Sequence, residues 1–235
     1  MSELKVNKIS PASGTETTLG DSSDDFLLPS GAEIIAQSGS TITIASGATL
    51  ANAGTATGFG GGAWDYVSTA TASTSASLAF TNMVDGSDYL YTTDAIFPVD
   101  NDTDLRAEFG VAGPTYRTSG YIGQVQGITT SGTSQSGELT TGVFMNNDAT
   151  NVGLGNVAPE GNRSGYLLVT NPANASTKTS CHGMATLLNP STQILLNFYG
   201  SIYNTTAEAH TSIKFILSSG NIVSGKILQY KRARS

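Results

Sequence analysis

The sequence predicts an all-β protein in which a thin, intertwined stalk precedes a β-sandwich head. Charged residues make up only 12% of the chain and Gly contributes 27 of its 235 residues, a composition that disfavours helices and suits short strands joined by tight turns. A short motif also recurs at a fixed interval in the N-terminal part. From Trp64 onward, strand-like runs follow one another about every eight to fifteen residues, a spacing typical of sandwiches and barrels.

The recurring motif is Ser-Gly, two small or polar residues, and then an aliphatic residue. Its copies end at Ile34, Ile42 and Leu50, about eight residues apart, and such periodicity indicates a repeated structural unit. Each copy predicts a short strand with a Gly turn, presenting one aliphatic row. A repeat unit buries its apolar row only against neighbours. We therefore expect these three residues to form the core of a homotrimeric stalk.

The chain divides into three expected parts. Residues 1–29 would be an N-terminal segment, in which Leu4 and Val6 alternate with polar neighbours as in a half-buried strand. Residues 30–62 would be the repeat stalk, which ends in a hinge of three consecutive glycines. Residues 63–235 would form the head, which is long enough to enclose a hydrophobic core.

The head is expected to consist of short strands, several of which alternate. Ile213, Phe215 and Leu217 would face one side of a sheet, and the residues between them would face the other. The expected strands span residues 64–69, 77–81, 89–96, 105–109, 121–128, 138–145, 166–170, 182–188, 194–203, 212–217 and 226–230.

The charge balance argues against a nucleic-acid-binding protein. The net charge is -7 and the isoelectric point is about 4.6, whereas a nucleic-acid binder needs a cationic face that displaces counterions. Residues 214–235 form a basic end without any acid. This end would either dock against the acidic body or a neighbouring chain, or be a solvated edge strand that its cations protect from aggregation.

Cys181 is the only cysteine, so no intrachain disulfide can form, and we expect it to be a small buried residue. Residues 1–10 lack the apolar core of a secretory signal. No run approaches the roughly 18 apolar residues that span a bilayer. The sequence therefore predicts a soluble chain that is made in a cytoplasm and is not inserted into a membrane.

Several short motifs are distributed along most of the chain. They are Leu-Lys-Val-Asn-Lys-Ile at 4–9, Ser-Gly at 13–14, Leu-Gly-Asp at 19–21, Pro-Ser-Gly at 29–31, Gly-Thr-Ala-Thr-Gly-Phe at 54–59 before Trp64, Ser-Ser-Gly-Asn at 218–221 and Ser-Gly-Lys-Ile at 224–227. Single positions of the head accompany them: Phe80, Thr81, Asn82, Tyr89, Tyr91, Pro98, Asp102, Leu105, Arg106, Gly113, Tyr116 and Tyr121. In these features the chain resembles the tail-fibre and related virion structural proteins of tailed bacteriophages, particularly marine and cyanobacterial ones.

This resemblance implies a homotrimer on the tail or capsid exterior of a virion, with a C-terminal β-sandwich head of jelly-roll-like form. It implies a bacterial cell-surface glycan or protein as receptor and other virion proteins of the tail, baseplate or capsid as partners. It implies no catalytic residues, and the sequence leads us to assign no cofactor and no metal ligand. We expect the strand with Leu4, Val6 and Ile9 to attach to the virion, because this leaves the larger head free. A capsid-bound head fibre or cement protein without a receptor is the alternative.

The sharpest acidic cluster is the run Asp-Asn-Asp-Thr-Asp at 100–104. Its alternate oxygens resemble the first half of a calcium loop. Leu105 and Val111 stand where an EF-hand needs Gly and a bidentate Glu, so that motif is excluded. A looser cation site and a solvated turn are the two remaining interpretations.

Enzymatic interpretations need groups that converge. His182 and His210 are too few for a zinc site without carboxylates or Cys181. Cys181 and His182 would point to opposite faces of a strand, which does not suit a shared metal or a nucleophile–base pair. A glycan depolymerase needs two carboxylates about 5–9.5 Å apart. The candidates that sequence leaves open for such a pair are Glu108, Glu138, Glu160 and Glu208.

Tyrosines are the better functional lead, because several lie beside Gly, Ser, Thr and Asn. Rigid rings among small polar residues are typical of adaptable binding surfaces. The structural alternative is a ring packed in the core with its hydroxyl bonded at the rim. The candidate receptor contacts are Tyr116, Tyr121, Tyr166, Tyr199 and Tyr203.

Overall fold

The computed structural model describes residues 64–113, 115–129, 132, 134–146, 153–156, 163–191 and 194–234. Outside this described part lie the expected virion-attachment residues Leu4, Val6 and Ile9, and the expected stalk residues Ile34, Ile42 and Leu50. The attachment segment, the stalk and the expected limits between the three parts therefore stay predictions.

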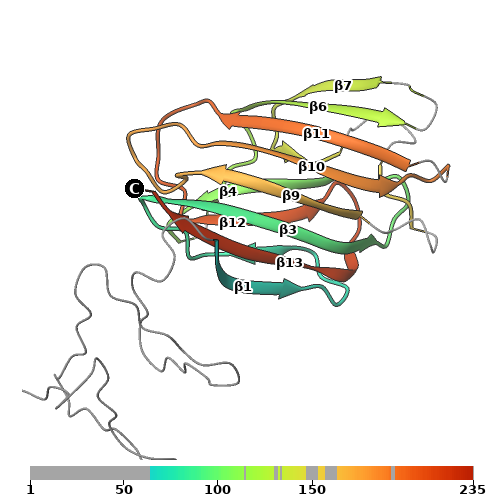
Figure 1. The fold of residues 1–235 in the computed structure, drawn as a ribbon, viewed down its shortest axis with the longest axis horizontal. Helices are drawn as coiled ribbons and strands as arrows, with labels where there is room; N and C mark the ends of the chain where they lie inside the picture. Colours follow the sequence, from blue (N-terminus) through green and yellow to red (C-terminus); the bar gives the residue numbers. More distant parts are fainter. Residues whose placement is uncertain are drawn as a thin grey trace, which may run out of the picture. The chain divides into compact units, whose positions relative to one another are not determined.

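The larger of two antiparallel sheets has eight strands in the order β1-β13-β3-β9-β10-β11-β6-β7 (Figure 1). The sequence's short β-branched and aromatic runs between Gly and Asn-rich turns form these strands. Their bounds are Asp65–Thr71 (β1), Ile222–Ala233 (β13), Ser87–Pro98 (β3), Arg163–Thr170 (β9), Ser180–Leu188 (β10), Ile194–Tyr203 (β11), Tyr121–Thr129 (β6) and Ser134–Leu139 (β7).

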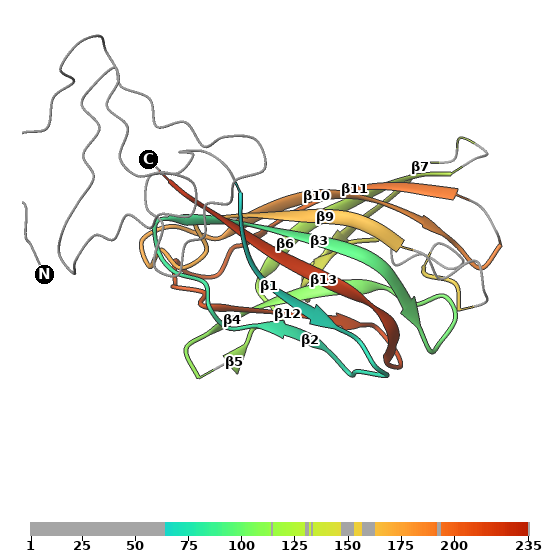
Figure 2. The same cartoon turned by 60° about the horizontal axis from the view of Figure 1, so that its bottom comes forward.

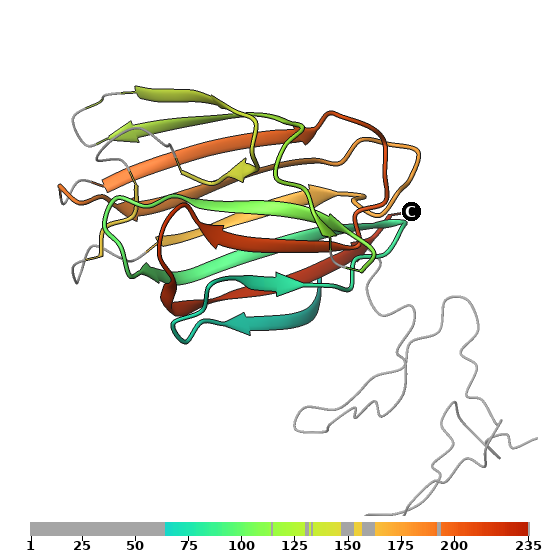
Figure 3. The same ribbon diagram turned by 180° about the vertical axis from the view of Figure 1, so that it is seen from behind.

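The smaller sheet covers one face of the larger one, as Figures 2 and 3 show from two sides. Its strand order is β2-β12-β4-β5, and β8 pairs with β4 beside this path. The described part of the chain is thus all-β and two-layered, and no helix that could cross a membrane occurs in it. The bounds are Leu78–Phe80 (β2), Ser212–Leu217 (β12), Leu105–Val111 (β4), Thr115–Tyr116 (β5) and Val143–Phe144 (β8).

The hydrophobic core lies between the two sheets. Tyr89, Tyr91 and Leu167 of the larger sheet are fully buried, and they belong to the same cluster as Phe80 and Phe215 of the smaller sheet. The ring of Tyr91 lies 5.3 Å from that of Phe80 and 5.4 Å from that of Phe215, between centroids. Aromatic rings attract one another at these distances, so this contact joins the layers.

Most expected strands are confirmed, and two of them match to the residue. The runs 194–203 and 212–217 coincide with β11 and β12. Ile213, Phe215 and Leu217 share the buried face of β12, as the alternation predicted. Binary patterning therefore located these elements correctly.

One expected strand, at 138–145, is wrong as a single element. β7 ends at Leu139 in the larger sheet, and β8 begins at Val143 in the smaller one. Between them, a Cβ atom at Gly142 would lie 3.1 Å from the carbonyl oxygen of Ala107. The chain crosses between the layers here, at a point where a side chain would be tightly packed against the backbone of β4.

Candidate binding face

Three neighbouring strands of the larger sheet, β6, β10 and β11, turn an uncharged face away from the core. Along β6, buried and exposed residues alternate from Tyr121 to Thr129, because successive side chains of a strand point to opposite faces. No Asp, Glu, Lys or Arg is among the outward residues of these three strands. This uncharged face consists of Ile122, Gln124, Gln126, Ile128, Ser180, His182, Met184, Thr186, Leu188, Ile194, Leu196, Phe198, Gly200 and Ile202.

The strand β11 turns its more apolar side outward. Its outward residues are Ile194, Leu196, Phe198, Gly200 and Ile202. Its inward residues are Leu195, Asn197, Tyr199, Ser201 and Tyr203. Ile194 is 55% exposed and Phe198 is 43% exposed. Large apolar side chains gathered on an open surface mark sites of interaction, so this face has the composition of one that a partner covers.

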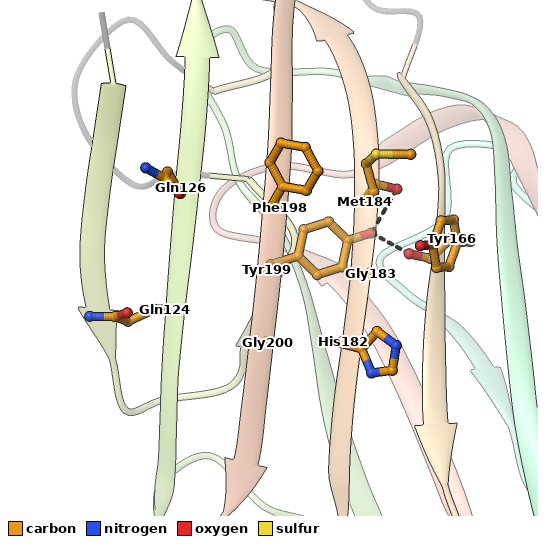
Figure 4. Close-up of a pocket in the computed structure, with 9 residues that line it drawn as sticks. All are labelled: Gln124, Gln126, Tyr166, His182, Gly183, Met184, Phe198, Tyr199 and Gly200. Atoms are coloured by element: carbon orange, nitrogen blue, oxygen red, sulfur yellow. Dashed lines mark hydrogen bonds between the residues drawn. The ribbon is translucent and has the colours of Figure 1, made fainter.

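A depression of about 400 Å³ lies in the uncharged face (Figure 4). It is open to solvent and receives residues from four adjacent strands, β6, β9, β10 and β11. Its polar and apolar groups are mixed, as in sites that fix a small ligand's orientation. The lining residues are Gln124, Gln126, Tyr166, His182, Gly183, Met184, Phe198, Tyr199 and Gly200.

The depression exists because Gly200 contributes no side chain. His182 and Gln124 are its cross-strand partners on β10 and β6, and they lie on either side of it in Figure 4. A Cβ atom at Gly200 would lie 3.6 Å from the carbonyl oxygen of Cys181 and 3.9 Å from Cβ of His182. These are ordinary contact distances, so packing alone does not require a glycine here.

Beneath the depression, Gly183 makes room for the ring of Tyr199. A Cβ atom at Gly183 would lie 2.5 Å from the Cε2 atom of this ring and would overlap the carbonyl oxygen of Tyr166. The Tyr199 hydroxyl donates a hydrogen bond of 2.6 Å to that carbonyl, and Arg163 Nη2 donates to the hydroxyl at 3.3 Å. Burial raises the pKa of Tyr199. The floor of the depression is therefore rigidly held.

Two hydrogen-bonding groups at the edge of the depression have no partner among the described residues. Within the described part of the chain, neither the Gln124 amide nor the His182 imidazole has a hydrogen-bond partner, and both side chains are exposed. An amide and an imidazole each offer donor and acceptor positions. Tyr166 adds a half-buried phenol on β9. The depression can therefore bind neutral polar groups beside the exposed Phe198 ring.

The structure separates the five candidate tyrosines. Tyr166 and Tyr199 both line the depression, but Tyr199 is 4% exposed and packs beneath it. Tyr121 is also buried; its hydroxyl accepts a hydrogen bond from the Phe109 amide at 2.8 Å, and burial, the largest cause, raises its pKa. Tyr203 packs against Tyr121, with 5.4 Å between ring centroids. These three rings stabilise the interior, which is the structural alternative that the sequence left open.

Tyr116 belongs to β5 of the smaller sheet. The Nζ atom of Lys214 is 4.6 Å from the centroid of its ring, a cation–π contact. The ring also covers Gly110 of the neighbouring strand, where a Cβ atom would be 2.9 Å from its Cδ1 atom. Of the five tyrosines, only Tyr166 presents a partly exposed ring to the uncharged face.

Two of the candidate acid–base carboxylates have described side chains, and each is held by cations. Glu108 is 1% exposed and lies 2.8 Å from Lys214 Nζ and 3.3 Å from Arg106 Nη2. Glu208 accepts hydrogen bonds of 2.8 and 2.7 Å from Arg117, which lower the pKa of Glu208. These contacts favour a structural role for both residues, and the lowered pKa of Glu208 also argues against its being a general acid near neutral pH, which needs a raised pKa. Outside the described part lie the side chain of Glu138 and residue Glu160.

A chain of polar contacts joins Thr179, the residue before β10, to the segment before β12. Thr179 Oγ1 lies 2.7 Å from His210 Nδ1, and His210 Nε2 lies 3.2 Å from Glu208 Oε1. This order of hydroxyl, imidazole and carboxylate is that of nucleophilic hydrolases. Thr179 is 1% exposed and His210 is fully buried, so the hydroxyl is closed to any substrate. Burial lowers the pKa of His210.

The acidic run at 100–104 is anchored by hydrogen bonds. The Gly153 amide donates to Asp102 Oδ1 at 3.0 Å, and Asn146 Nδ2 donates to Asp104 Oδ1 at 2.7 Å. Among the described residues, no three His, Cys, Asp or Glu side chains are grouped to hold a metal ion. The contacts favour the interpretation of this run as a turn between β3 and β4.

The prediction for Cys181 and His182 is confirmed. Cys181 is buried and burial raises the pKa of its thiol to about 12, whereas His182 is exposed on the opposite face of β10. An unreactive thiol follows from such burial.

Sequence reasoning missed most of the depression, including both glutamines, Met184, Phe198 and Gly200. One signal was present in the sequence: the run Tyr-Ile-Gly-Gln-Val-Gln-Gly-Ile-Thr at 121–129 contains no charged residue. In the structure, every second residue of this run is exposed. The sequence does not show which strand lies beside this run, because β6 and β11 are distant in sequence although they are adjacent in the sheet.

Comparison with known proteins adds no relative: no family model, no curated protein and no solved structure matches the chain.

Proposed function

We propose that this protein is a homotrimeric fibre protein of a bacteriophage virion, and that its jelly-roll-like head attaches to a bacterial surface receptor through the uncharged face. The motif resemblance supports the viral role. The observation that carries the binding role is the depression in a solvent-facing surface to which β6, β10 and β11 contribute no outward Asp, Glu, Lys or Arg. Exposed apolar groups with a few oriented polar ones are typical of recognition sites.

Attachment by such a head is multivalent. One depression of this size makes few contacts, so each head would bind weakly. Three heads on one trimer raise the effective concentration of the second and third binding events, and overall avidity then exceeds the single-site affinity by about 10²–10⁴. The affinity of a single depression for the receptor can therefore be low.

Competition for adsorption tests this function. The purified full-length protein, added to bacteria before phage, should reduce the adsorption rate of the virion that carries it. Binding of the protein to the cells would support the receptor role. A mass near three times 24.2 kDa by light scattering would support the trimer. Failure of the protein to bind any host cell while virions adsorb normally would contradict the receptor role.

A second candidate is a structural role on the virion surface, in which a neighbouring virion protein covers the uncharged face. The exposure of Ile122, Ile128 and Ile194 beyond the depression favours it, because aliphatic side chains suit protein interfaces. Labelled antibodies on intact virions distinguish the two, since a fibre head must be accessible and a covered face is not. Deletion of residues 1–10 should remove the protein from virions if Leu4, Val6 and Ile9 provide the attachment.

A further inference from the structure

We propose that the depression over Gly200 is a subsite for one uncharged sugar ring of a neutral polysaccharide. This inference rests on the proposed receptor function and names the ligand class that the site fits. It is carried by four features of the described residues: the charge of the face, the exposed ring, the unengaged polar groups and the missing side chain at Gly200.

The charge of the face selects a neutral ligand. None of the outward residues of β6, β10 and β11 is Asp, Glu, Lys or Arg. An acidic saccharide would lose the water bound to its carboxylates or phosphates. No cation among these outward residues would replace that water, so the desolvation of the acid groups would be costly. A neutral saccharide sheds only the water of hydroxyl groups, which the site's own donors and acceptors replace.

Phe198 supplies an apolar platform at the edge of the depression. Its ring is 43% exposed and lies next to Met184, its cross-strand partner on β10. One face of a pyranose ring presents C–H groups, and burying them against an aromatic ring is favourable because apolar surface leaves water. Met184 adds a flexible side chain that adapts to the contour of the ligand.

Gln124 and His182 supply the polar contacts from opposite sides of Gly200. Both side chains are exposed and lack hydrogen-bond partners among the described residues, so binding breaks no hydrogen bond within this part of the chain. A sugar hydroxyl donates one hydrogen bond and accepts others, which matches an amide and an imidazole. Sites that satisfy hydroxyls in this way discriminate strongly against analogues that lack them.

Gly200 determines whether a ring fits between these groups. Its Cβ position is open, with no atom nearer than 3.6 Å, so the sheet would accept a larger residue. The side chain would then project between His182 and Gln124, where we place the sugar. This separates the effect of a substitution on binding from its effect on folding.

The test uses the full-length protein and its Gly200→Val variant. Valine favours strands and fills the depression. Thr69→Val, in the exposed part of β1, is the matched control on the same sheet. The probes are neutral gluco-, galacto- and manno-oligosaccharides and, for comparison, hexuronic-acid oligosaccharides, titrated by saturation-transfer NMR and calorimetry. At least one neutral class should bind, the acidic class should bind at least tenfold more weakly, and Gly200→Val should weaken neutral binding at least tenfold with an unchanged melting temperature.

Each contrary outcome has a distinct meaning. Neutral binding that Gly200→Val leaves intact would place the sugar elsewhere and overturn the subsite. If the protein adsorbs to cells but binds none of the neutral probes, the sugar is not the ligand, and the proposed receptor function is still supported. Protein that does not bind cells at all would remove the proposed function itself. A lower mass of Gly200→Val by light scattering would show that a second copy, not a sugar, covers the face.

Discussion

The two ends of the larger sheet present very different faces to solvent, although one pleated surface joins them. At one end, β6, β10 and β11 carry the uncharged face. At the other end, β1, β13 and β3 carry a charged face, on which Asp88 pairs with Arg232 at 3.0 Å and with Arg234 at 3.5 Å. A further pair there joins Lys226 to Asp94 at 3.3 Å. A single row of cross-strand neighbours runs from Thr69 through Leu228, Thr92, Tyr166 and Met184 to Phe198 and Gln126.

The charged face is what an antiparallel sheet needs when water covers it, since ion pairs and polar groups remain solvated. The uncharged face lacks this protection and exposes Phe198 and Ile194 instead. Because both faces belong to one sheet with one core beneath it, folding does not account for the difference. The contrast fits the proposed function, in which solvent covers one end of the sheet and a partner covers the other.

We expect the greatest change in stability from substitutions at Gly183, beneath the uncharged face. Gly183→Ala should destabilise the protein by about 3 kcal/mol, because overpacking of a rigid core has this cost and the new Cβ would lie 2.5 Å from the Tyr199 ring. Gly200→Ala, on the outer side of the adjacent strand, should leave stability equal or raise it by up to about 1 kcal/mol. Urea denaturation of the full-length variants measures both. Equal losses for the two would show that the depression, too, is dictated by packing.

The next effect contrasts the two ends in binding. Phe198→Lys places a charge on the uncharged face and should weaken cell binding at least tenfold, or about 1.4 kcal/mol. Thr69→Lys lies in the same row at the charged end and should change binding by less than about twofold. Flow cytometry with labelled full-length protein gives both numbers. A similar loss for the two variants would place the receptor contact outside the uncharged face.

A smaller effect concerns the ion pairs of the charged face. Asp88 is 6% exposed and also accepts a hydrogen bond of 3.1 Å from the Asn171 amide, so Asp88→Asn should cost about 1–2 kcal/mol. Asp94→Asn should cost at most about 0.5 kcal/mol, because both members of its pair are about half exposed and screened by water. Denaturation midpoints compare them, and neither substitution should alter cell binding.

The smallest effect is a pH dependence that separates the two histidines. Burial lowers the pKa of His210 from its usual 6.5, so the unfolded chain takes up the proton more readily than the folded one. Stability is therefore complete above about pH 6.5 and declines as the pH falls below it. His210→Gln should flatten this decline between pH 7 and 5, whereas His182→Gln, in the uncharged face, should retain it. Thermal melts across this range would refute the assignment if both variants behaved alike.

Much of the strand layout was predictable from the sequence, because alternation and turn residues are local. β11 and β12 were located to the residue, and β5 was missed because Thr115–Tyr116 is too short to show a period. The run at 138–145 has the composition of one strand because residues that favour strands lie on both sides of its Gly: Thr140 and Thr141 before it, and Val143 and Phe144 after it. Local patterns do not reveal that a chain changes sheets at a single glycine.

The candidate site was less predictable. Phe198 and Tyr199 are adjacent aromatics, and alternation requires that they face opposite ways without deciding which one faces outward. From their apolar character alone, Ile194, Leu196 and Phe198 would be expected to face the core. The structure buries Asn197, Tyr199 and Ser201 instead, because the hydroxyl of Tyr199 reaches the Tyr166 carbonyl and its ring fits over Gly183.

The all-β class, most strand positions and the burial of Cys181 follow from the amino-acid sequence alone, since each of these depends on residues that are neighbours along the chain. The solvent-facing side of each strand and the order of the strands become clear only in the folded sheets. Gln124, Tyr166, His182 and Gly200 meet because β6, β9, β10 and β11 are adjacent in the sheet. Strand order depends on contacts between residues far apart in sequence, and no local pattern encodes those contacts.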